Sequence, residues 1–339
     1  MAGGRLHRKM GSRFKARLLL LALPALLAGC APMPGIPDRE AEGKLAVVAT
    51  LFPYYDFARQ IAGEQVDLAL VVPAGMDSHS FEPTPADIRT IQAADVLLCN
   101  GGAMEHWLWE VLDAVDTSET AVVAMMDYVD VVEEEMVEGM EDGVGGHVHE
   151  EGDGRHHGDG EDGEYDEHVW TSPANAMKMA EAVRDVLARE DPGHRQEYEA
   201  ATEAYLAELE RIDAGFRQVC RERKRDTIIL GDKFPFRYLA DQYGLDYWAA
   251  FSGCSTDTEP SAKTIAFLID KVRQEGIPVV YYLELSSPRV AEVIGEETGA
   301  KPLLLHSCHN VTRLQFNQGA TYVGLMEQNI ENLRKGLVE

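Results

Sequence analysis

Three features that mark common protein classes are missing from this chain of 339 residues. Its five cysteines show no C-x-x-C spacing, which excludes a cysteine-rich zinc knuckle. Neither H-E-x-x-H nor a serine nucleophile elbow occurs, so the usual motifs of zinc peptidases and serine hydrolases are absent. The apolar run from Leu18 to Ala28 has about half the residues of a bilayer-spanning helix, and no other run is long enough. A transmembrane protein is therefore not expected.

Basic residues are also scarce, with 31 Lys and Arg against 58 Asp and Glu and a formal net charge of −27. Residues 1–29 hold six basic residues and no acid, so their removal would leave a charge of about −33. So acidic a surface repels nucleic acid and anionic lipid and favours cations. Nucleic acid is therefore excluded as a partner.

The N-terminus has the layout of a secretory signal peptide, with basic residues, a short apolar core and then small residues. Leu27-Ala28-Gly29-Cys30 resembles a bacterial lipobox, in which the cysteine thiol takes a diacylglycerol. We therefore expect a signal peptide over residues 1–29 and an extracytoplasmic protein anchored to the membrane through lipidated Cys30. Residues 30–43 are rich in proline and predict a tether. An ordinary signal peptide with a chance cysteine is the alternative.

Apolar segments with strand character alternate with helical segments along the chain. Strands are expected over residues 44–50, 66–72, 94–99, 227–230, 246–250, 279–283 and 303–305. This alternation indicates parallel sheets with helices on both faces, and about 300 mature residues are enough for two α/β lobes. The predicted boundaries are an N-terminal lobe over 44–190, a linking helix over 191–224 and a C-terminal lobe over 225–339. Ligand sites in such folds lie in the cleft at the carboxyl ends of the strands.

Residues 130–167 break this alternation. Sixteen of them are Asp or Glu, nine are Gly and four are His. No core can be built from this composition, so we interpret residues 133–167 as a mobile surface loop inserted in the N-terminal lobe.

Two histidines lie where ligand residues are expected. His79 directly follows the strand over 66–72 and has Asp77 and Glu82 beside it, and such carboxylates can hold an imidazole in one tautomer. His168 ends the acidic segment, abuts a Val-Trp pair and precedes a helix that Thr171 or Ser172 would cap. Both positions suit a metal, although a polar loop residue without a ligand is the alternative for each.

The same two segments carry a family resemblance. His79-Ser-Phe-Glu-Pro-Thr-Pro is similar to the H-x-F/Y-E-P-T-P signature of the zinc- and manganese-binding solute receptors of bacterial ABC importers. Asp-Glu-His168-Val-Trp-Thr-Ser-Pro is similar to their D-P-H-x-W-x-D-P signature. The resemblance covers nearly all of the mature chain. It implies two α/β lobes joined by a long rigid helix, one metal between them, and a monomeric receptor that delivers its ion to an ABC permease.

The chain departs from the family pattern at two ligand positions. The position of the third histidine is Lys233, and a protonated lysine has no lone pair to donate, although it can pair with an acid or balance charge. At the last ligand, usually an acid, His306 aligns best. Three neutral imidazoles suit Zn²⁺, whereas Mn²⁺ draws on more carboxylates, so manganese is the less favoured ion. The expected ligands are His79, His168 and His306, with a water, Glu259 or His309 as the fourth.

Other residues have roles that depend on this assignment. Cys254 and Cys308 lie in loops near the predicted cleft, where a disulfide is favoured over a cysteine ligand because the compartment is oxidising. The loop histidines are expected to gather zinc weakly and pass it to the cleft; a solvating tract without a metal role is the alternative. These histidines are His147, His149, His156 and His157.

Two other functions remain open from the residues alone. A secreted zinc hydrolase would need an open metal position and a general base within reach of bound water. A metal buffer or surface adhesin on the same scaffold would need no permease.

Overall fold

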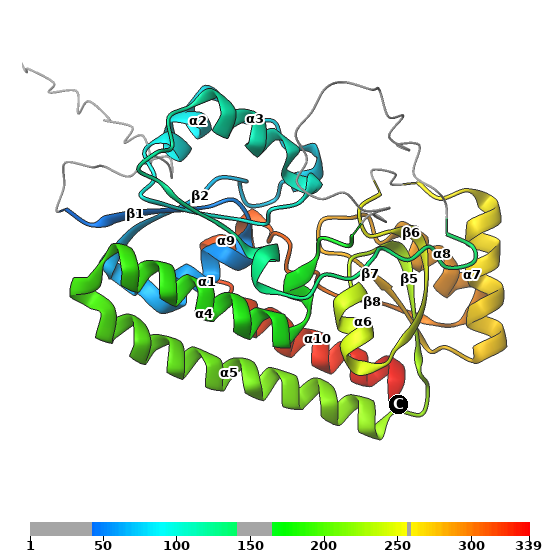
Figure 1. Ribbon diagram of the computed structural model, residues 1–339. Helices are drawn as coiled ribbons and strands as arrows, with labels where there is room; N and C mark the ends of the chain where they lie inside the picture. Colours follow the sequence, from blue (N-terminus) through cyan, green and yellow to red (C-terminus); the bar gives the residue numbers. More distant parts are fainter. Residues whose placement is uncertain (1–42, 141–164, 256–258) are drawn as a thin grey trace, which may run out of the picture. The chain divides into compact units, whose positions relative to one another are not determined.

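Four parallel strands form the first sheet, in the order β2-β1-β3-β4 (Figure 1). The computed structural model describes residues 43–140, 165–255 and 259–339. The strands are β1 (Leu45–Ala49), β2 (Val66–Leu70), β3 (Val96–Cys99) and β4 (Ala121–Ala124). The central strands β1 and β3 are almost wholly buried, which is why they are continuous apolar runs rather than alternating ones.

A second sheet of four parallel strands has the order β6-β5-β7-β8. Its strands are β5 (Thr227–Phe234), β6 (Asp246–Ser252), β7 (Val279–Tyr282) and β8 (Lys301–Leu304). The prediction of two parallel α/β sheets is confirmed. β5, however, was expected to end at Leu230, and it continues through a register shift that carries Lys233 to the carboxyl end of the strand.

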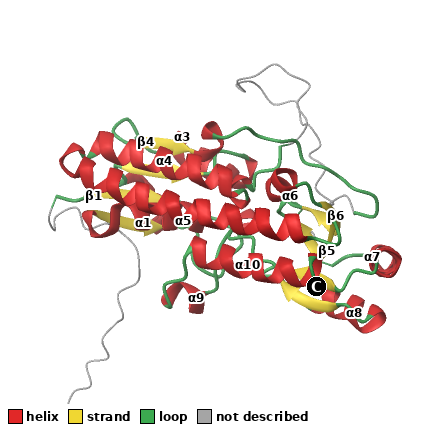
Figure 2. Cartoon of the chain, turned by 90° about the horizontal axis from the view of Figure 1, so that it is seen from below, coloured by secondary structure: helices red, strands yellow, loops and turns green. Residues whose placement is uncertain are grey.

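Two long helices connect the sheets. α4 (Pro173–Glu190) is capped by Ser172, whose hydroxyl accepts a hydrogen bond from the Asn175 amide, and it ends before Pro192. α5 (Arg195–Glu222) has 28 residues and is therefore about 42 Å long at 1.5 Å per residue. α5 packs against both α4 and α10 (Tyr322–Leu337), and the three lie side by side (Figure 2). The predicted long linking helix is confirmed.

The remaining helices cover the sheets. They are α1 (Phe52–Ala62), α2 (Pro85–Gln92), α3 (His106–Ala114), α6 (Arg237–Tyr243), α7 (Ala262–Glu275), α8 (Arg289–Thr298) and α9 (Arg313–Asn317). Two short 3-10 turns, η2 (Ser78–Ser80) and η5 (Val169–Thr171), lie where chemistry-bearing residues were expected. Among the described helices, none has the length and apolar character needed to cross a bilayer.

One hydrophobic core runs from the first sheet through α4, α5 and α10 into the second sheet. Tyr54 and Phe57 of α1 and Phe216 of α5 belong to it and are fully or almost fully buried. A smaller core lies under α7 and α8. Because the main core is shared, the described residues of both sheets belong to one compact unit.

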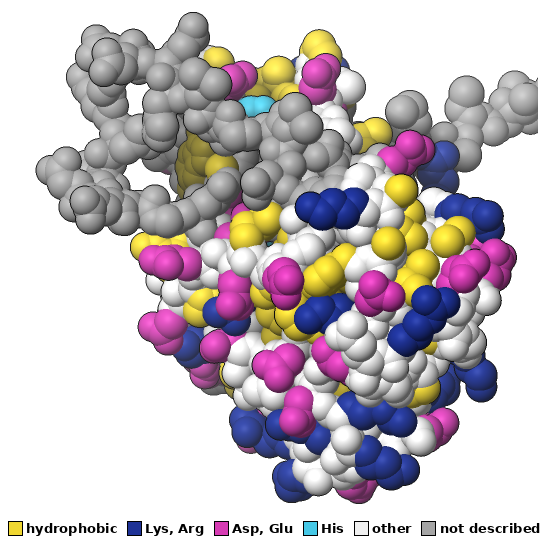
Figure 3. Space-filling model, turned by 90° about the vertical axis from the view of Figure 1, so that its right-hand side faces the viewer, with side chains coloured by type: hydrophobic (Ala, Val, Ile, Leu, Met, Phe, Trp, Pro, Cys, Tyr) yellow, Lys and Arg dark blue, Asp and Glu magenta, His cyan; other side chains and the backbone are white. Residues whose placement is uncertain are grey.

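Acidic and basic side chains are interspersed on the face of the molecule drawn in Figure 3. Ion pairs between opposite charges include Lys271 with Glu138 and Arg237 with Asp241. The strong negative charge of the chain is thus not gathered into one patch on the described part of this face.

Candidate metal centre

Three imidazoles meet in the structure, those of His79, His168 and His309. One ring nitrogen from each lies within 4.8 Å of the other two. The ring centroids are 5.5 Å apart for His79 and His309 and 6.0 Å apart for the other two pairs. Within the described ranges, no carboxylate or thiol is close enough to all three nitrogens to join this group, which we call the histidine cluster.

The loop after β2 positions His79. Asp77 caps the turn η2, and its Oδ1 accepts a hydrogen bond from the His79 amide at 2.9 Å. Gly75 makes the bend before it with a φ of +87°, a conformation that glycine adopts without strain, and its amide donates to the Val311 carbonyl at 2.7 Å. The His79 loop of the first sheet is therefore tied to the loop that follows β8 in the second sheet.

A carboxylate orients His168. The Nδ1 atom of His168 lies 3.2 Å from Asp166 Oδ1, and the same oxygen accepts the His168 amide at 2.8 Å. Both residues are buried, so the pair excludes water. A proton on Nδ1, shared with the carboxylate, leaves the Nε2 lone pair free for a metal, which is the common arrangement around metal-bound histidines.

His309 is held by residues from both halves of the chain. Its Nε2 atom makes a short hydrogen bond with the Ser78 hydroxyl of η2. Its ring stacks on Trp170 with the centroids 5.5 Å apart and the planes inclined by 30°. Its amide donates to Ser307 Oγ at 3.2 Å. The third imidazole is thus preorganised beside the other two.

Burial favours the neutral form of two of these imidazoles, those of His79 and His309. Loss of solvent, together with the neighbouring His168, lowers the pKa of His79 from 6.5 to about 4. The same two effects, burial and the adjacent imidazoles, hold the pKa of His309 well below 6.5. Neutral imidazoles have free lone pairs, so the structure presents ligands that a divalent cation need not deprotonate.

The cluster faces a small cavity of about 50 Å³, which we call the histidine cavity. A cavity of this size has room for an ion together with a water molecule. The residues that line the cavity are Asp77, His79, His168, Lys233, Pro235, Gly253, Leu283, Glu284, Leu285, Ser286, Ser307 and His309.

Lys233 and Glu284 are the two charged side chains that β5 and the end of β7 contribute to this lining. The Lys233 ammonium lies 3.8 Å from Asp77 Oδ2, so it pairs with an acid rather than ligating. Glu284 accepts hydrogen bonds from the amide of Ser307 at 2.9 Å and from its hydroxyl at 2.6 Å. Glu284 therefore fixes the loop after β8.

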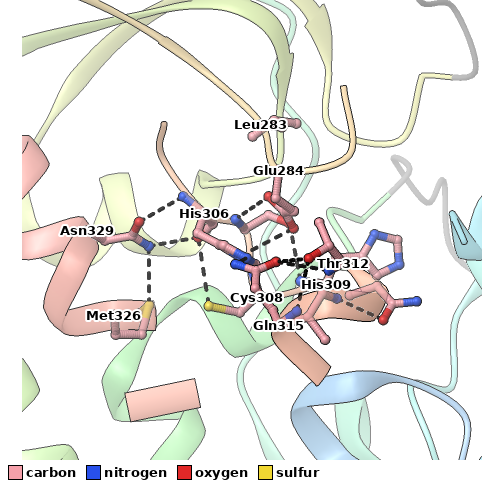
Figure 4. A network of polar contacts seen from close by, with 12 residues as sticks. Leu283, Glu284, His306, Cys308, His309, Thr312, Gln315, Met326 and Asn329 are labelled. Atoms are coloured by element: carbon pink, nitrogen blue, oxygen red, sulfur yellow. Dashed lines mark hydrogen bonds and ion pairs between the residues drawn. The ribbon is translucent and has the colours of Figure 1, made fainter. Parts of the chain in front are cut away.

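His306 does not join the histidine cluster, contrary to our expectation. It is 1% exposed, and its amide and carbonyl are bound by the side chain of Asn329 on α10, both at 2.7 Å (Figure 4). Its Nδ1 atom accepts the Cys308 amide at 3.0 Å. Burial lowers the pKa of His306, which therefore stays neutral as an acceptor. Cys308 has a φ of +60°, and the turn it makes delivers His309 to the cavity instead.

The motif around these residues explains why His306 rather than His309 was expected as the third ligand. Both histidines lie in His306-Ser-Cys-His309, three positions apart, and an alignment with one acidic residue cannot separate them. The left-handed conformation at Cys308 has no clear sequence signal, because such a φ is uncommon for a residue other than glycine.

The structure does not form the expected disulfide, since Cys254 and Cys308 are both free thiols. Cys308 is fully buried and its sulfur lies 3.8 Å from the His306 carbonyl, while the Cys254 amide is bound by Glu134 at 3.1 Å. Glu259 is exposed and lies outside the cluster. Cys30 and the four loop histidines fall outside the described residues.

Comparison with known proteins places this geometry in a family. Residues 47–336 match the family model of zinc-uptake complex component A, periplasmic. The zinc-binding lipoprotein AdcA of Streptococcus pneumoniae is 32% identical over 323 residues, which cover 95% of this chain but only 60% of AdcA. The high-affinity zinc uptake system protein ZnuA of Bacillus subtilis is 30% identical over 332 residues, covering 97% of this chain and 99% of that protein.

Solved structures agree with the sequence relatives. The metal-dependent lipoprotein YcdH of Bacillus subtilis has a TM-score of 0.71 and 29% identity and covers 87% of this chain. The Zn(II)-bound ZnuA-like domain of Streptococcus pneumoniae AdcA has a TM-score of 0.70 and 28% identity and covers 88% of this chain. Both known chains are covered completely. The chain belongs to the family of periplasmic zinc-uptake component A proteins.

Proposed function

We propose that this protein is an extracytoplasmic receptor that captures zinc and delivers it to the permease of an ABC importer. The observation that carries the proposal is the histidine cluster, with three ring nitrogens within 4.8 Å of one another in a cavity of about 50 Å³. Three imidazoles and one open position suit tetrahedral Zn²⁺, whereas Mn²⁺ favours more oxygen ligands. The relatives are named a zinc-binding lipoprotein, AdcA, and a high-affinity zinc uptake system protein, ZnuA, which supports the same ion.

Capture follows from the preorganised ligands, which are His79, His168 and His309. The lowered pKa values of His79 and His309 mean that these two rings need not release protons when zinc enters at neutral pH. The carboxylate of Asp166 holds the His168 ring in place through its contact with Nδ1, so that Nε2 faces the site. A water molecule is the simplest fourth ligand, because the cavity has room for one beside the ion.

Delivery follows from where the ligands are attached. His79 follows β2 of the first sheet, and His309 follows β8 of the second. A movement that separated the two sheets would pull these imidazoles apart and break the Ser78–His309 hydrogen bond that joins them. Docking on a permease that favoured the separated state would therefore weaken the site and release the ion.

We infer binding rather than catalysis for this site. A zinc hydrolase requires space for its substrate and a base within reach of the metal-bound water. The cavity holds little beyond an ion, and both oxygens of Glu284 are engaged by Ser307. Turnover of a peptide, ester or phosphate substrate by the zinc-loaded protein would favour the hydrolase instead.

Membrane attachment completes the proposal. The signal-peptide layout and the lipobox-like sequence at Cys30 support a lipid anchor, as does the name of the lipoprotein AdcA. One chain contributes every residue of the cluster, so a monomer suffices for binding.

The test is a metal analysis of protein purified without a chelator, followed by competition between zinc and manganese. We expect one tightly bound zinc per chain and displacement of manganese by zinc. His194→Ala is a suitable control, because this histidine lies in the turn between α4 and α5, away from the cluster. Substoichiometric zinc, or a preference for manganese, would contradict the proposal.

A further inference from the structure

Lys233 lies inside the lining of the histidine cavity, an unusual position for a cation in a site that takes a cation. It stands at the carboxyl end of β5, after the register shift, and its side chain is 12% exposed. An ammonium group so close to a bound divalent ion repels it, and low solvent access screens the repulsion poorly. A side chain that only filled space at position 233 would not need to be charged.

The partner of Lys233 explains the placement. The ammonium lies 3.8 Å from Oδ2 of Asp77, whereas Oδ1 of the same carboxylate accepts the His79 amide. Asp77 and Glu284 are the carboxylates that line the described cavity, and Ser307 already engages Glu284. Among these four carboxylate oxygens, Oδ2 of Asp77 is the one that accepts neither Ser307 nor the His79 amide, and it is the oxygen that Lys233 pairs with.

Carboxylate oxygens change which metal a site prefers. Imidazole suits zinc, while manganese binds better as carboxylates are added. We propose that Lys233 is a specificity-determining residue: by engaging Asp77 across the cavity, it keeps a carboxylate out of the coordination shell and disfavours manganese relative to zinc. This inference rests on the proposed function, because it deepens the account of the same site.

The experiment is a double-mutant cycle with manganese and zinc dissociation constants measured by chelator competition on the full chain. Lys233→Leu removes the charge without adding a metal ligand, and the ratio of the manganese constant to the zinc constant should fall by about two- to fivefold, the effect of a modest ion pair. Lys233→Arg keeps the charge and should keep the ratio. In an Asp77→Asn background, Lys233→Leu should leave the ratio unchanged, because no carboxylate remains to be released.

A matched control separates this effect from the general loss of a lysine. Lys178 pairs with Asp130 at 3.1 Å on the surface, and Lys178→Leu should not alter the ratio. An unchanged ratio in Lys233→Leu with zinc binding intact would overturn the inference, as would the same fall in the Asp77→Asn background. If the unmodified protein bound no zinc at all, the proposed function would fail instead, so the two failures are distinguishable.

Discussion

Replacing His309 and His306 separately distinguishes a metal ligand from a structural histidine three residues away. His309→Ala removes one imidazole of the histidine cluster. His306→Ala removes an imidazole that accepts the Cys308 amide at 3.0 Å. The two substitutions are chemically identical, so their different consequences report position alone.

The two substitutions are expected to change different quantities, zinc affinity for His309→Ala and folding stability for His306→Ala. A structural zinc site contributes about 10–16 kcal/mol, so one of four bonds is worth about 3 kcal/mol, and His309→Ala should weaken zinc binding by more than about 100-fold. His306→Ala leaves a buried amide unpaired and opens a small cavity, which should destabilise the metal-free fold by about 2–4 kcal/mol. The Asn329 bonds to the His306 backbone survive, so the loop stays in place and zinc affinity should change by at most about tenfold.

Two assays separate these effects. Chelator competition gives the zinc dissociation constant of each variant, and urea unfolding of the metal-free protein gives its stability. His194→Ala serves as the control for loss of a histidine outside the cluster. If His306→Ala lost more than about 100-fold in zinc affinity while His309→Ala lost little, the ligand assignment around β8 would have to be reversed.

Three further predictions follow from the sequence and the site. The metal-free protein should lose stability as pH falls from 6.5 toward about 4, because His79 and His309 have lowered pKa values in the fold and the unfolded chain binds protons first. The melting temperature should therefore fall less steeply with decreasing pH in His79→Asn than in the unmodified protein, and an equal pH dependence would refute this cause. Deleting residues 139–163 should leave one tight zinc per chain and remove only weaker binding in a titration, because the histidine cluster lies outside this segment. Loss of the tight site on deletion would instead make a loop histidine a true ligand. Cys30→Ser should move the protein from the membrane fraction to the soluble fraction, and unchanged fractionation would remove the lipid anchor from the account.

The sequence was most informative where local pattern determines structure. Apolar segments that alternate with helical segments predicted the two parallel sheets, and the linking helix expected over 191–224 contains α5. His79 and His168 were found because each follows a strand or precedes a helix cap within a recognisable motif. In these places the residues that determine the local structure lie within a few positions of one another in the sequence.

Long-range packing set what the sequence could not predict. The positive φ of Cys308 decides that His309, not His306, faces the cavity, and that conformation depends on Asn329 and Glu284 from distant elements. The pairing of Lys233 with Asp77 joins residues 156 positions apart, through a strand extension that the apolar pattern did not indicate. Cys254 and Cys308 are free thiols, and the full burial of Cys308 arises from packing between distant elements.

The central claim is that one zinc ion sits among His79, His168 and His309. A crystal structure of the zinc-loaded protein, with anomalous data collected at the zinc edge, tests it most directly. We expect a single strong peak about 2.0–2.1 Å from one nitrogen of each of these imidazoles. A peak bound by His306, or a site without all three members of the histidine cluster, would contradict it.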